Sequence, residues 1–237
     1  LSKFSRYQSW WFSALGTRLK NIVSDVPKPM APISGRPFLE ILLESLIAKG
    51  FKRVILSLCH MPEKISDHFG NNYKGIEIIY SIETFPLGTG GAIKRSLKLA
   101  SNKDIFIING DTFLDLDYKK VYACYIKNKN PLIVIRKVSN VSRYGEVKVK
   151  NDRIISFGSR RINKKAGYIN AGCYIFQKDI FNEIDIEESF SIENDFFPTA
   201  IKEQPHQFYV LKDLFIDIGI PSDFNKAQLI LKDIYAN

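Results

Sequence analysis

The stretch Asp104-Ile-Phe-Ile-Ile-Asn-Gly-Asp111 has an apolar centre and ends in a polar turn. The run Arg53-Val-Ile-Leu-Ser-Leu58, which follows a loop, is also short and apolar. Runs of this kind, bounded by turn residues, are typical of strands covered on both faces in a parallel sheet. The pattern therefore predicts two buried strands, and it places Asp111 at the end of one of them.

Helical patterns separate the strands of the first half. Apolar residues recur at helical spacing from Phe38 to Ile47 and stop at Gly50, and further helices are indicated over 62–69 and 92–99. The last of these follows a strand over 76–82 and a glycine loop, Gly88-Thr89-Gly90-Gly91. Alternating strands and helices predict an α/β fold with a doubly wound sheet, whose ligands bind at the carboxyl ends of the strands.

The second half is less regular. The two-residue turn at 151–152, flanked by alternating apolar residues, predicts a hairpin of 145–150 and 153–157. Other predicted elements are strands over 132–138 and 168–176, a helix over 192–203, a strand pair or one bent strand over 207–218, and a last helix over 223–235 capped by Ser222. Because no repeat or linker interrupts the chain, we expect a single domain over residues 1–237.

Composition narrows the class of protein. The chain has 237 residues, of which 45% are hydrophobic and 25% charged, as in soluble globular proteins. No apolar run approaches the roughly 20 residues of a membrane-spanning helix, and the first twelve residues lack the apolar core of a signal peptide. We therefore expect a cytoplasmic protein. The three cysteines are far apart, which supports neither a disulfide framework nor a zinc site.

The net charge of +9 favours an anionic partner, which can be nucleic acid, a membrane surface or a phosphorylated small molecule. Lysine and arginine are spread along the chain, and the densest cluster, at 160–165, has no interleaved aromatic residues of the kind that bind single strands. Small phosphates fit better than polymers, so we expect neither a nucleic acid nor a membrane partner. A basic nucleic-acid-binding domain is kept as an alternative.

The segment Leu15-Gly16-Thr17-Arg18-Leu19-Lys20, followed by Val26-Pro27-Lys28-Pro29-Met30, has the composition of a phosphate site. Gly16 and Thr17 let backbone N–H groups approach phosphate oxygens, and Arg18 and Lys28 supply charge-assisted hydrogen bonds. A surface loop with solvated cations explains these residues equally well.

Two aspartates follow apolar runs, Asp111 and Asp217. A carboxylate that emerges beside a buried strand needs a cation or a hydrogen bond to offset its desolvation. Mg²⁺ is usually held by one or two carboxylates plus substrate phosphates. As a pair near a phosphate segment, the aspartates predict a Mg²⁺ site; singly, each is more often a capping residue.

Seven motifs, in this order along most of the chain, together resemble the sugar-1-phosphate nucleotidyltransferases: Leu15-Gly16-Thr17-Arg18-Leu19, Pro27-Lys28-Pro29-Met30, Gly88-Thr89-Gly90-Gly91, Asn109-Gly110-Asp111, Asn170-Ala171-Gly172, Glu193-Asn194-Asp195 and Asp217-Ile218-Gly219. The resemblance implies a Rossmann-like mixed sheet of the nucleotide-diphospho-sugar transferase type. It also implies transfer of a nucleotidyl group from an NTP to a sugar 1-phosphate, with release of pyrophosphate.

Among the branches of the family, the chain is most similar to short bacterial enzymes that use GTP and D-glycero-α-D-manno-heptose 1-phosphate for surface polysaccharide precursors. Mannose- and glucose-1-phosphate nucleotidyltransferases are the alternatives. Matching motifs assign the triphosphate to Leu15, Gly16, Thr17 and Arg18, and catalytic roles to Arg18, Lys28 and Asp111. They assign the base to Gly88 and Thr89, the metal to Asp111 and Asp217, and the sugar to Gly145, Asn170 and Glu193. A homo-oligomer is left open.

The chain departs from the family pattern in two places. Residues 1–14 replace the usual apolar strand, and Ser13 and Ala14 stand where the family has glycine, so we hypothesise a change of reading frame or start site there. Ser159 and Arg160 replace Glu and Lys of a Phe-x-Glu-Lys motif, which affects the prediction for the sugar. A catalytically impaired nucleotide-binding homologue is therefore a further alternative.

Overall fold

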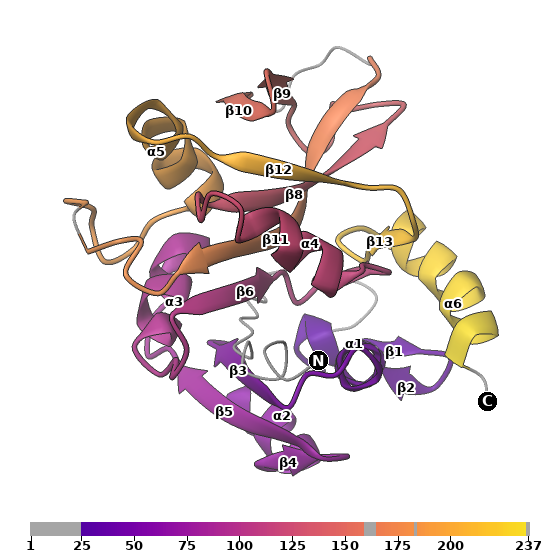
Figure 1. Ribbon diagram of the computed structural model, residues 1–237. Coiled ribbons are helices and arrows are strands. Elements are labelled where there is room, and N and C mark those ends of the chain that lie inside the picture. Colours follow the sequence, from indigo (N-terminus) through magenta and orange to yellow (C-terminus); the bar gives the residue numbers. More distant parts are fainter. Residues whose placement is uncertain (1–24, 159–164, 183, 236–237) are drawn as a thin grey trace.

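The computed structural model describes residues 25–158, 165–182 and 184–235 (Figure 1). The atypical segment 1–14, the phosphate-site residues Leu15, Gly16, Thr17 and Arg18, and the substitutions Ser159 and Arg160 lie outside these ranges.

The central sheet has six strands and is mixed (Figure 1). Strand β11 lies at its middle and is antiparallel to both β6 and β8, whereas β12 is parallel to β8. The strands run in the order β10 (Arg153–Phe157), β9 (Val147–Lys150), β11 (Gly167–Gln177), β8 (Leu132–Val138) and β12 (Gln207–Leu211), with β6 (Asp104–Ile108) also paired to β11. The predicted hairpin is confirmed: β9 and β10 flank Asn151 and Asp152, both of which have positive φ.

Smaller sheets complete the β structure. Strands β3 (Arg53–Leu58) and β5 (Ile76–Ile82) pair in parallel, and β4 (Asn72–Tyr73) pairs antiparallel to β5. Strand β7 (Thr112–Leu114) pairs with β13 (Phe215–Asp217), and β1 (Pro32–Ile33) pairs with β2 (Arg36–Pro37). The α-helices are α1 (Phe38–Ala48), α2 (Pro62–Phe69), α3 (Gly88–Leu97), α4 (Tyr118–Tyr125), α5 (Phe197–Glu203) and α6 (Pro221–Tyr235).

The central sheet is covered on both faces. Along β6, Phe106 and Ile108 join a core cluster with residues of α1, α4 and α6, whereas Ile105 and Ile107 join a second cluster with residues of α3 and α5. Successive side chains of a strand point to opposite faces, so an unbroken apolar run fills two cores. The prediction of a buried strand beginning at Asp104 is confirmed, although β6 ends at Ile108 and Asp111 lies three residues beyond it.

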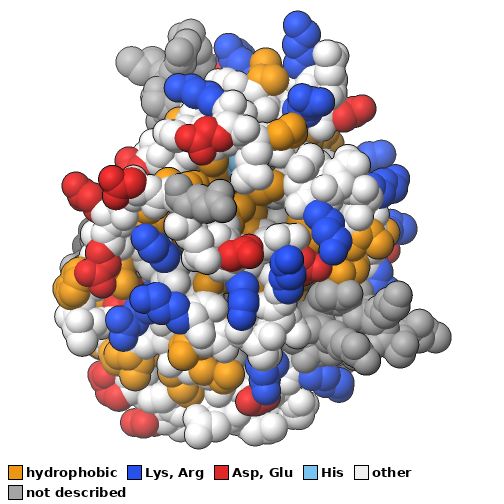
Figure 2. Space-filling view, turned by 60° about the vertical axis from the view of Figure 1, so that its left-hand side comes forward, with side chains coloured by type: hydrophobic (Ala, Val, Ile, Leu, Met, Phe, Trp, Pro, Cys, Tyr) orange, Lys and Arg blue, Asp and Glu red, His pale blue; other side chains and the backbone are white. Residues whose placement is uncertain are grey.

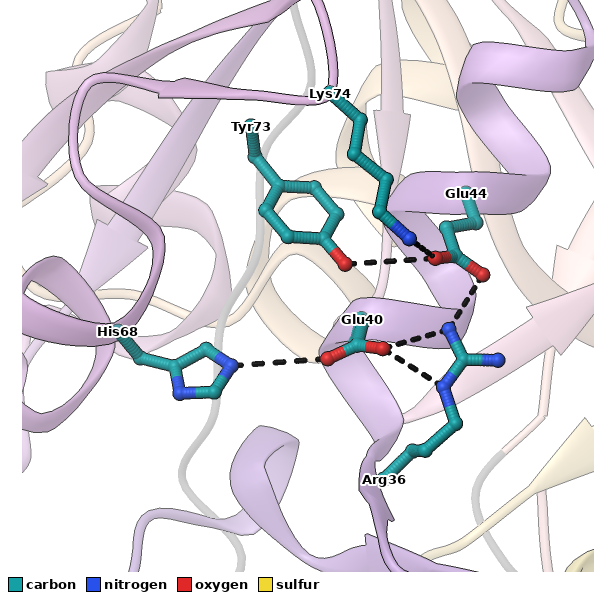
Figure 3. A network of polar contacts seen from close by, with 6 residues as sticks. All are labelled: Arg36, Glu40, Glu44, His68, Tyr73 and Lys74. Carbon is teal, nitrogen blue, oxygen red and sulfur yellow. Dashed lines mark hydrogen bonds and ion pairs between the residues drawn. The ribbon is translucent and has the colours of Figure 1, made fainter.

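A polar network joins α1 to the edge of the β3–β5–β4 sheet (Figure 3). Glu40 and Glu44, one turn apart on α1, both bind the guanidinium of Arg36, at 2.6 and 2.5 Å. Glu44 also accepts from Tyr73 of β4 and pairs with Lys74, and Glu40 lies 3.7 Å from His68 of α2. The network connects α2, β2 and β4 to α1. It lies on the polar side of α1, opposite the apolar side chains that the helix buries.

Three predictions about elements are wrong in detail. The glycine segment is not a loop before a helix at Ala92, because α3 already begins at Gly88. The run 207–218 forms two strands in different sheets rather than a pair or one bent strand, since β12 pairs with β8 and β13 with β7. Helix α6 begins at Pro221, so Ser222 lies inside its first turn instead of capping it.

In the described ranges, no helix is both long and apolar enough to cross a membrane.

Candidate active site

A cavity of about 980 Å³ opens beside the central sheet and brings predicted site residues together. Its lining includes Lys28, Thr89, Asp111, Gly145, Asn170, Glu193 and Asp217. These residues come from distant parts of the chain, so the fold creates the site. Gly88 is not part of the lining: its φ is +69°, and a Cβ there would lie 2.5 Å from the carbonyl oxygen of Phe190. The glycine is needed for this close backbone approach.

Lys28 lies in a short 3₁₀ turn, Lys28–Met30, that two prolines rigidify. The Met30 N–H donates to the carbonyl of Pro27 at 2.7 Å, and the Ala31 N–H donates to the carbonyl of Lys28 at 3.1 Å. The side chain of Lys28 is only 6% exposed, and its Nζ lies 2.5 Å from Oδ2 of Asp111. A buried ammonium needs such a partner. The turn therefore holds a positive charge at a defined point of the cavity wall.

The β7–β13 ladder brings Asp111 and Asp217 together. Asp217, the last residue of β13, is the register partner of Thr112, and the Ile218 N–H donates to the carbonyl of Asp111 at 2.9 Å. Beyond β13, the Gly219 N–H donates to Oδ1 of Asp217 at 2.6 Å. A Cβ on residue 219 would lie 2.7 Å from that oxygen, so glycine is required for this contact.

The Asp217 carboxyl is unfavourably placed as an anion. Burial, and then the negative charge of Asp111, raise its pKa to about 6, although Lys28 and the Gly219 N–H act in the opposite direction. A further cation beside the two carboxylates would relieve this repulsion.

The donor set fits Mg²⁺ because it consists of carboxylate oxygens. Among the described residues, no group of three or more His, Cys, Asp and Glu residues is placed to hold a metal ion. Two aspartates leave coordination positions for water and substrate phosphate oxygens, which is how Mg²⁺ usually binds at nucleotide sites.

On another wall of the cavity, Asn170 of β11 is fixed by two hydrogen bonds. Its Oδ1 accepts from the Gly172 N–H at 2.9 Å, and its Nδ2 donates to the hydroxyl of Tyr174 at 2.7 Å. Gly172 has a φ of +71°, and a Cβ there would lie 2.6 Å from Nδ2 of Asn109. The strand therefore needs glycine at this bend.

Glu193 lies in a π-helical turn, Ile192–Phe196, that precedes α5. Its Oε2 accepts from the Thr89 hydroxyl at 2.8 Å, and the same hydroxyl accepts from the Ile192 N–H at 2.9 Å. The Ser191 side chain caps the turn by accepting from the Asn194 N–H at 3.1 Å. The hydroxyl of Thr89, which the motif assigned to the base, thus ties the start of α3 to the turn that carries Glu193.

Sequence reasoning assigned no role to Tyr144, Glu146 and Tyr174. Tyr144 and Glu146 line the cavity on either side of Gly145, which has a φ of +88°, and Glu146 pairs with Lys165 at 2.8 Å. Their position on either side of Gly145, which was predicted to contact the sugar, could have identified them from the sequence. Tyr174 lies in a predicted buried strand, where an aromatic residue carries no functional signal.

A family model described as nucleotidyl transferase matches residues 15–233. The chain belongs to the nucleotidyl transferase family. The expectation of a Rossmann-like α/β fold of this family is confirmed by the structural similarities below. The match begins at Leu15, the residue at which the family motifs begin in the sequence.

Two relatives are both named D-glycero-α-D-manno-heptose 1-phosphate guanylyltransferase. The protein from Campylobacter jejuni is 43% identical over 89% of this chain and 93% of its own. The protein from Aneurinibacillus thermoaerophilus is 41% identical over 90% of this chain and 93% of its own. The crystal structure of HddC from Yersinia pseudotuberculosis is 37% identical and superposes with a TM-score of 0.85 over 95% of this chain and all of its own. HddC has also been solved in complex with GMP-PN, with a TM-score of 0.83 over the same shares of the two chains.

Proposed function

We propose that the protein transfers a guanylyl group from GTP to D-glycero-α-D-manno-heptose 1-phosphate and releases pyrophosphate. The observation that carries this proposal is the convergence of Lys28, Asp111 and Asp217 in one cavity with Asn170 and Glu193. The names of the two bacterial relatives and the GMP-PN complex of HddC support the choice of base and sugar.

The reaction needs no covalent enzyme intermediate. A phosphate oxygen of the sugar 1-phosphate attacks the α-phosphorus of GTP, a new O–P bond forms, and the bond to the bridging oxygen breaks as pyrophosphate leaves. Catalysis of such a transfer is mainly positioning and stabilisation of charge. The cavity offers groups for both tasks.

Lys28 is placed to stabilise negative charge on the reacting phosphates. Its ammonium is held by a rigid turn in a mostly buried position, so it needs little reorganisation during the reaction. Asp111 and Asp217 would hold Mg²⁺, which would neutralise charge on the phosphate oxygens when bound. The motif residues Gly16, Thr17 and Arg18 complete the triphosphate site in this proposal.

Asn170 and Glu193 give the sugar side of the cavity a donor and an acceptor. An amide N–H and a carboxylate together suit sugar hydroxyls, each of which both donates and accepts. Gly145 also lines the cavity and adds no side chain to it. We propose that these three residues contact the heptose.

The distribution of charge fits a small anion better than a polymer. On the face shown in Figure 2, Lys and Arg side chains are interspersed with Asp and Glu side chains. A nucleic-acid-binding face is expected to gather its basic residues in one stripe or patch. We also propose a cytoplasmic location, where GTP is available.

The test is to mix the purified protein with GTP, Mg²⁺ and a panel of sugar 1-phosphates, and to measure pyrophosphate. Release with GTP and the heptose 1-phosphate is expected to exceed release with mannose or glucose 1-phosphate. If pyrophosphate is released only with a different sugar 1-phosphate or a different NTP, the substrate is reassigned within the family. No release with any pair, while nucleotide still binds, would overturn the enzyme activity and support an impaired homologue.

A further inference from the structure

We propose that Tyr174 is a positioning residue whose buried hydroxyl holds Asn170 and Glu193 in register, and so sets the affinity and selectivity for the sugar 1-phosphate. This inference rests on the proposed function, because it concerns the sugar side of the same cavity. Tyr174 is not part of the cavity lining, so it acts only through the two lining residues to which its hydroxyl is bonded, Asn170 and Glu193.

A local distortion of β11 makes this contact possible. Residues four apart in a regular strand are separated by about 13 Å, which is too far for Asn170 and Tyr174 to bond. Here Asn170 pairs with Ile135 and Cys173 pairs with Val134, so three steps along β11 match one step along β8. The bulge and the positive φ of Gly172 shorten the strand, and the Asn170 amide reaches the Tyr174 hydroxyl at 2.7 Å.

The hydroxyl also meets the second sugar-side residue. The Tyr174 hydroxyl lies 3.4 Å from Oε1 of Glu193. A phenol has one proton to donate: the hydroxyl donates it to Oε1 of Glu193, and the phenol oxygen accepts from Nδ2 of Asn170. Nδ2 of Asn170 then has one hydrogen left for the cavity. The network thus presents a donor and an acceptor at a fixed spacing, which suits two hydroxyl groups of one sugar.

The ring that carries the hydroxyl is tightly packed. Tyr174 is 1% exposed, and its ring stacks on Phe176 with centroids 5.6 Å apart and meets Phe197 edge-on at 5.2 Å. Burial, and then the charge of Glu193, raise the pKa of Tyr174 well above its usual value. The phenol therefore stays protonated and remains a donor throughout the working pH range.

The far oxygen of Glu193 is held independently. Oε2 accepts from Thr89 at 2.8 Å and from the Ser191 hydroxyl at 3.2 Å. Removing the Tyr174 hydroxyl would therefore leave Glu193 anchored on one side, while Asn170 would lose the acceptor of its Nδ2. We expect the relative placement of the two side chains to loosen, with little effect on the fold.

The test is Tyr174→Phe, which removes one oxygen and keeps the ring. KM for the heptose 1-phosphate is expected to rise about tenfold, which corresponds to the loss of one well-placed hydrogen bond. KM for GTP should stay within about twofold, because the proposed phosphate-binding residues do not include Tyr174 or its partners. Selectivity for heptose 1-phosphate over mannose 1-phosphate should fall, because the two side chains that contact the sugar are less well placed.

Tyr125→Phe is the matched control. The Tyr125 hydroxyl is also buried and donates to Asp104 at 2.9 Å, but neither residue lines the cavity. The control should leave both KM values unchanged. A double-mutant cycle adds a second check: in an Asn170→Ala background, Tyr174→Phe should change the sugar KM by less than about threefold, because its effect runs partly through Asn170.

The outcomes separate this inference from the proposed function. If the wild type is active and Tyr174→Phe leaves the sugar KM unchanged, or raises both KM values equally, the positioning role is overturned while the enzyme activity stands. If the wild type makes no pyrophosphate, calorimetric titration of heptose 1-phosphate and of mannose 1-phosphate decides. The inference is supported if Tyr174→Phe binds heptose 1-phosphate more weakly than both the wild type and Tyr125→Phe do. Equal binding by the three proteins, or no binding by any of them, would overturn it.

Discussion

Asp217→Asn is expected to stabilise the metal-free protein while removing its response to Mg²⁺. The side chain lies beside Asp111, and burial together with that neighbouring charge raises its pKa to about 6. Asparagine has almost the same shape, can still accept from the Gly219 N–H, and carries no charge. The substitution therefore removes a repulsion that the folded protein bears in the absence of a cation.

The size of the effect follows from the pKa. A rise from 3.8 to about 6 corresponds to about 3 kcal/mol, at about 1.4 kcal/mol per pKa unit. This is an upper limit, since Asp217 is only half-buried and solvent screens part of the repulsion. We expect Asp217→Asn to raise the free energy of unfolding by about 1 to 2 kcal/mol near neutral pH.

The pH dependence gives the sign. Because the folded pKa lies above the unfolded one, the folded state binds more protons between pH 3.8 and about 6. Ionisation of Asp217 therefore lowers the free energy of unfolding as pH rises through this window. The destabilisation reaches its full size above the window. The gain from Asp217→Asn should be complete above about pH 7 and absent below about pH 4.

Urea unfolding with a chelator present, at several pH values, measures this gain. Asp115→Asn is the control, because Asp115 is 54% exposed and its ion pair with Lys49, at 2.9 Å, is open to solvent, so a change within about 0.5 kcal/mol is expected. Adding Mg²⁺ should stabilise the wild type and leave Asp217→Asn nearly unchanged. A loss of stability in Asp217→Asn near neutral pH, or a gain independent of pH, would refute the reasoning.

Three further substitutions test other parts of the site and of the core. Lys28→Met should lower kcat/KM about a hundredfold or more, because a preorganised cation is lost; steady-state kinetics with near-normal activity would show that Lys28 only closes an ion pair with Asp111. Gly219→Ala should raise the Mg²⁺ concentration needed for half-maximal rate, since its Cβ would lie 2.7 Å from Oδ1 of Asp217 and displace the carboxylate; an unchanged Mg²⁺ titration would argue against this contact. Burial lowers the pKa of His206 below 6.5, so the free energy of unfolding should fall as pH drops below about 6.5. His206→Phe should remove part of that fall. Equal pH slopes of the free energy of unfolding for the wild type and His206→Phe, measured by urea unfolding, would contradict this.

The strands and helices with simple periodicity could be predicted from the sequence. The bounds of β3, α2 and β5 agree with the predictions, since each combines a clear period with a terminating residue such as Gly70. Helix α4 was missed because its buried face consists of Tyr118, Val121 and Tyr125, in which two aromatic residues give a weak apolar signal. Local periodicity also gave no warning that α3 begins at Gly88, where three glycines pack against the segment around Phe190.

The site could be predicted only in part. The sequence predicted that Asp111 and Asp217 act as a pair, because both are aspartates that follow apolar runs. The β7–β13 register explains why they meet. That register depends on two short strands of three residues each, which no local pattern specifies. The role of Tyr174 depends on a bulge in β11 and on a turn of the chain before α5. Such contacts arise from tertiary packing, so a single sequence does not reveal them.

Pyrophosphate release from GTP, measured with and without D-glycero-α-D-manno-heptose 1-phosphate in the presence of Mg²⁺, tests the central claim most directly. Release should require both substrates and Mg²⁺, and Lys28→Met should abolish most of it. Release that is independent of the sugar phosphate, or none at all from a protein that still binds GTP, would contradict the account.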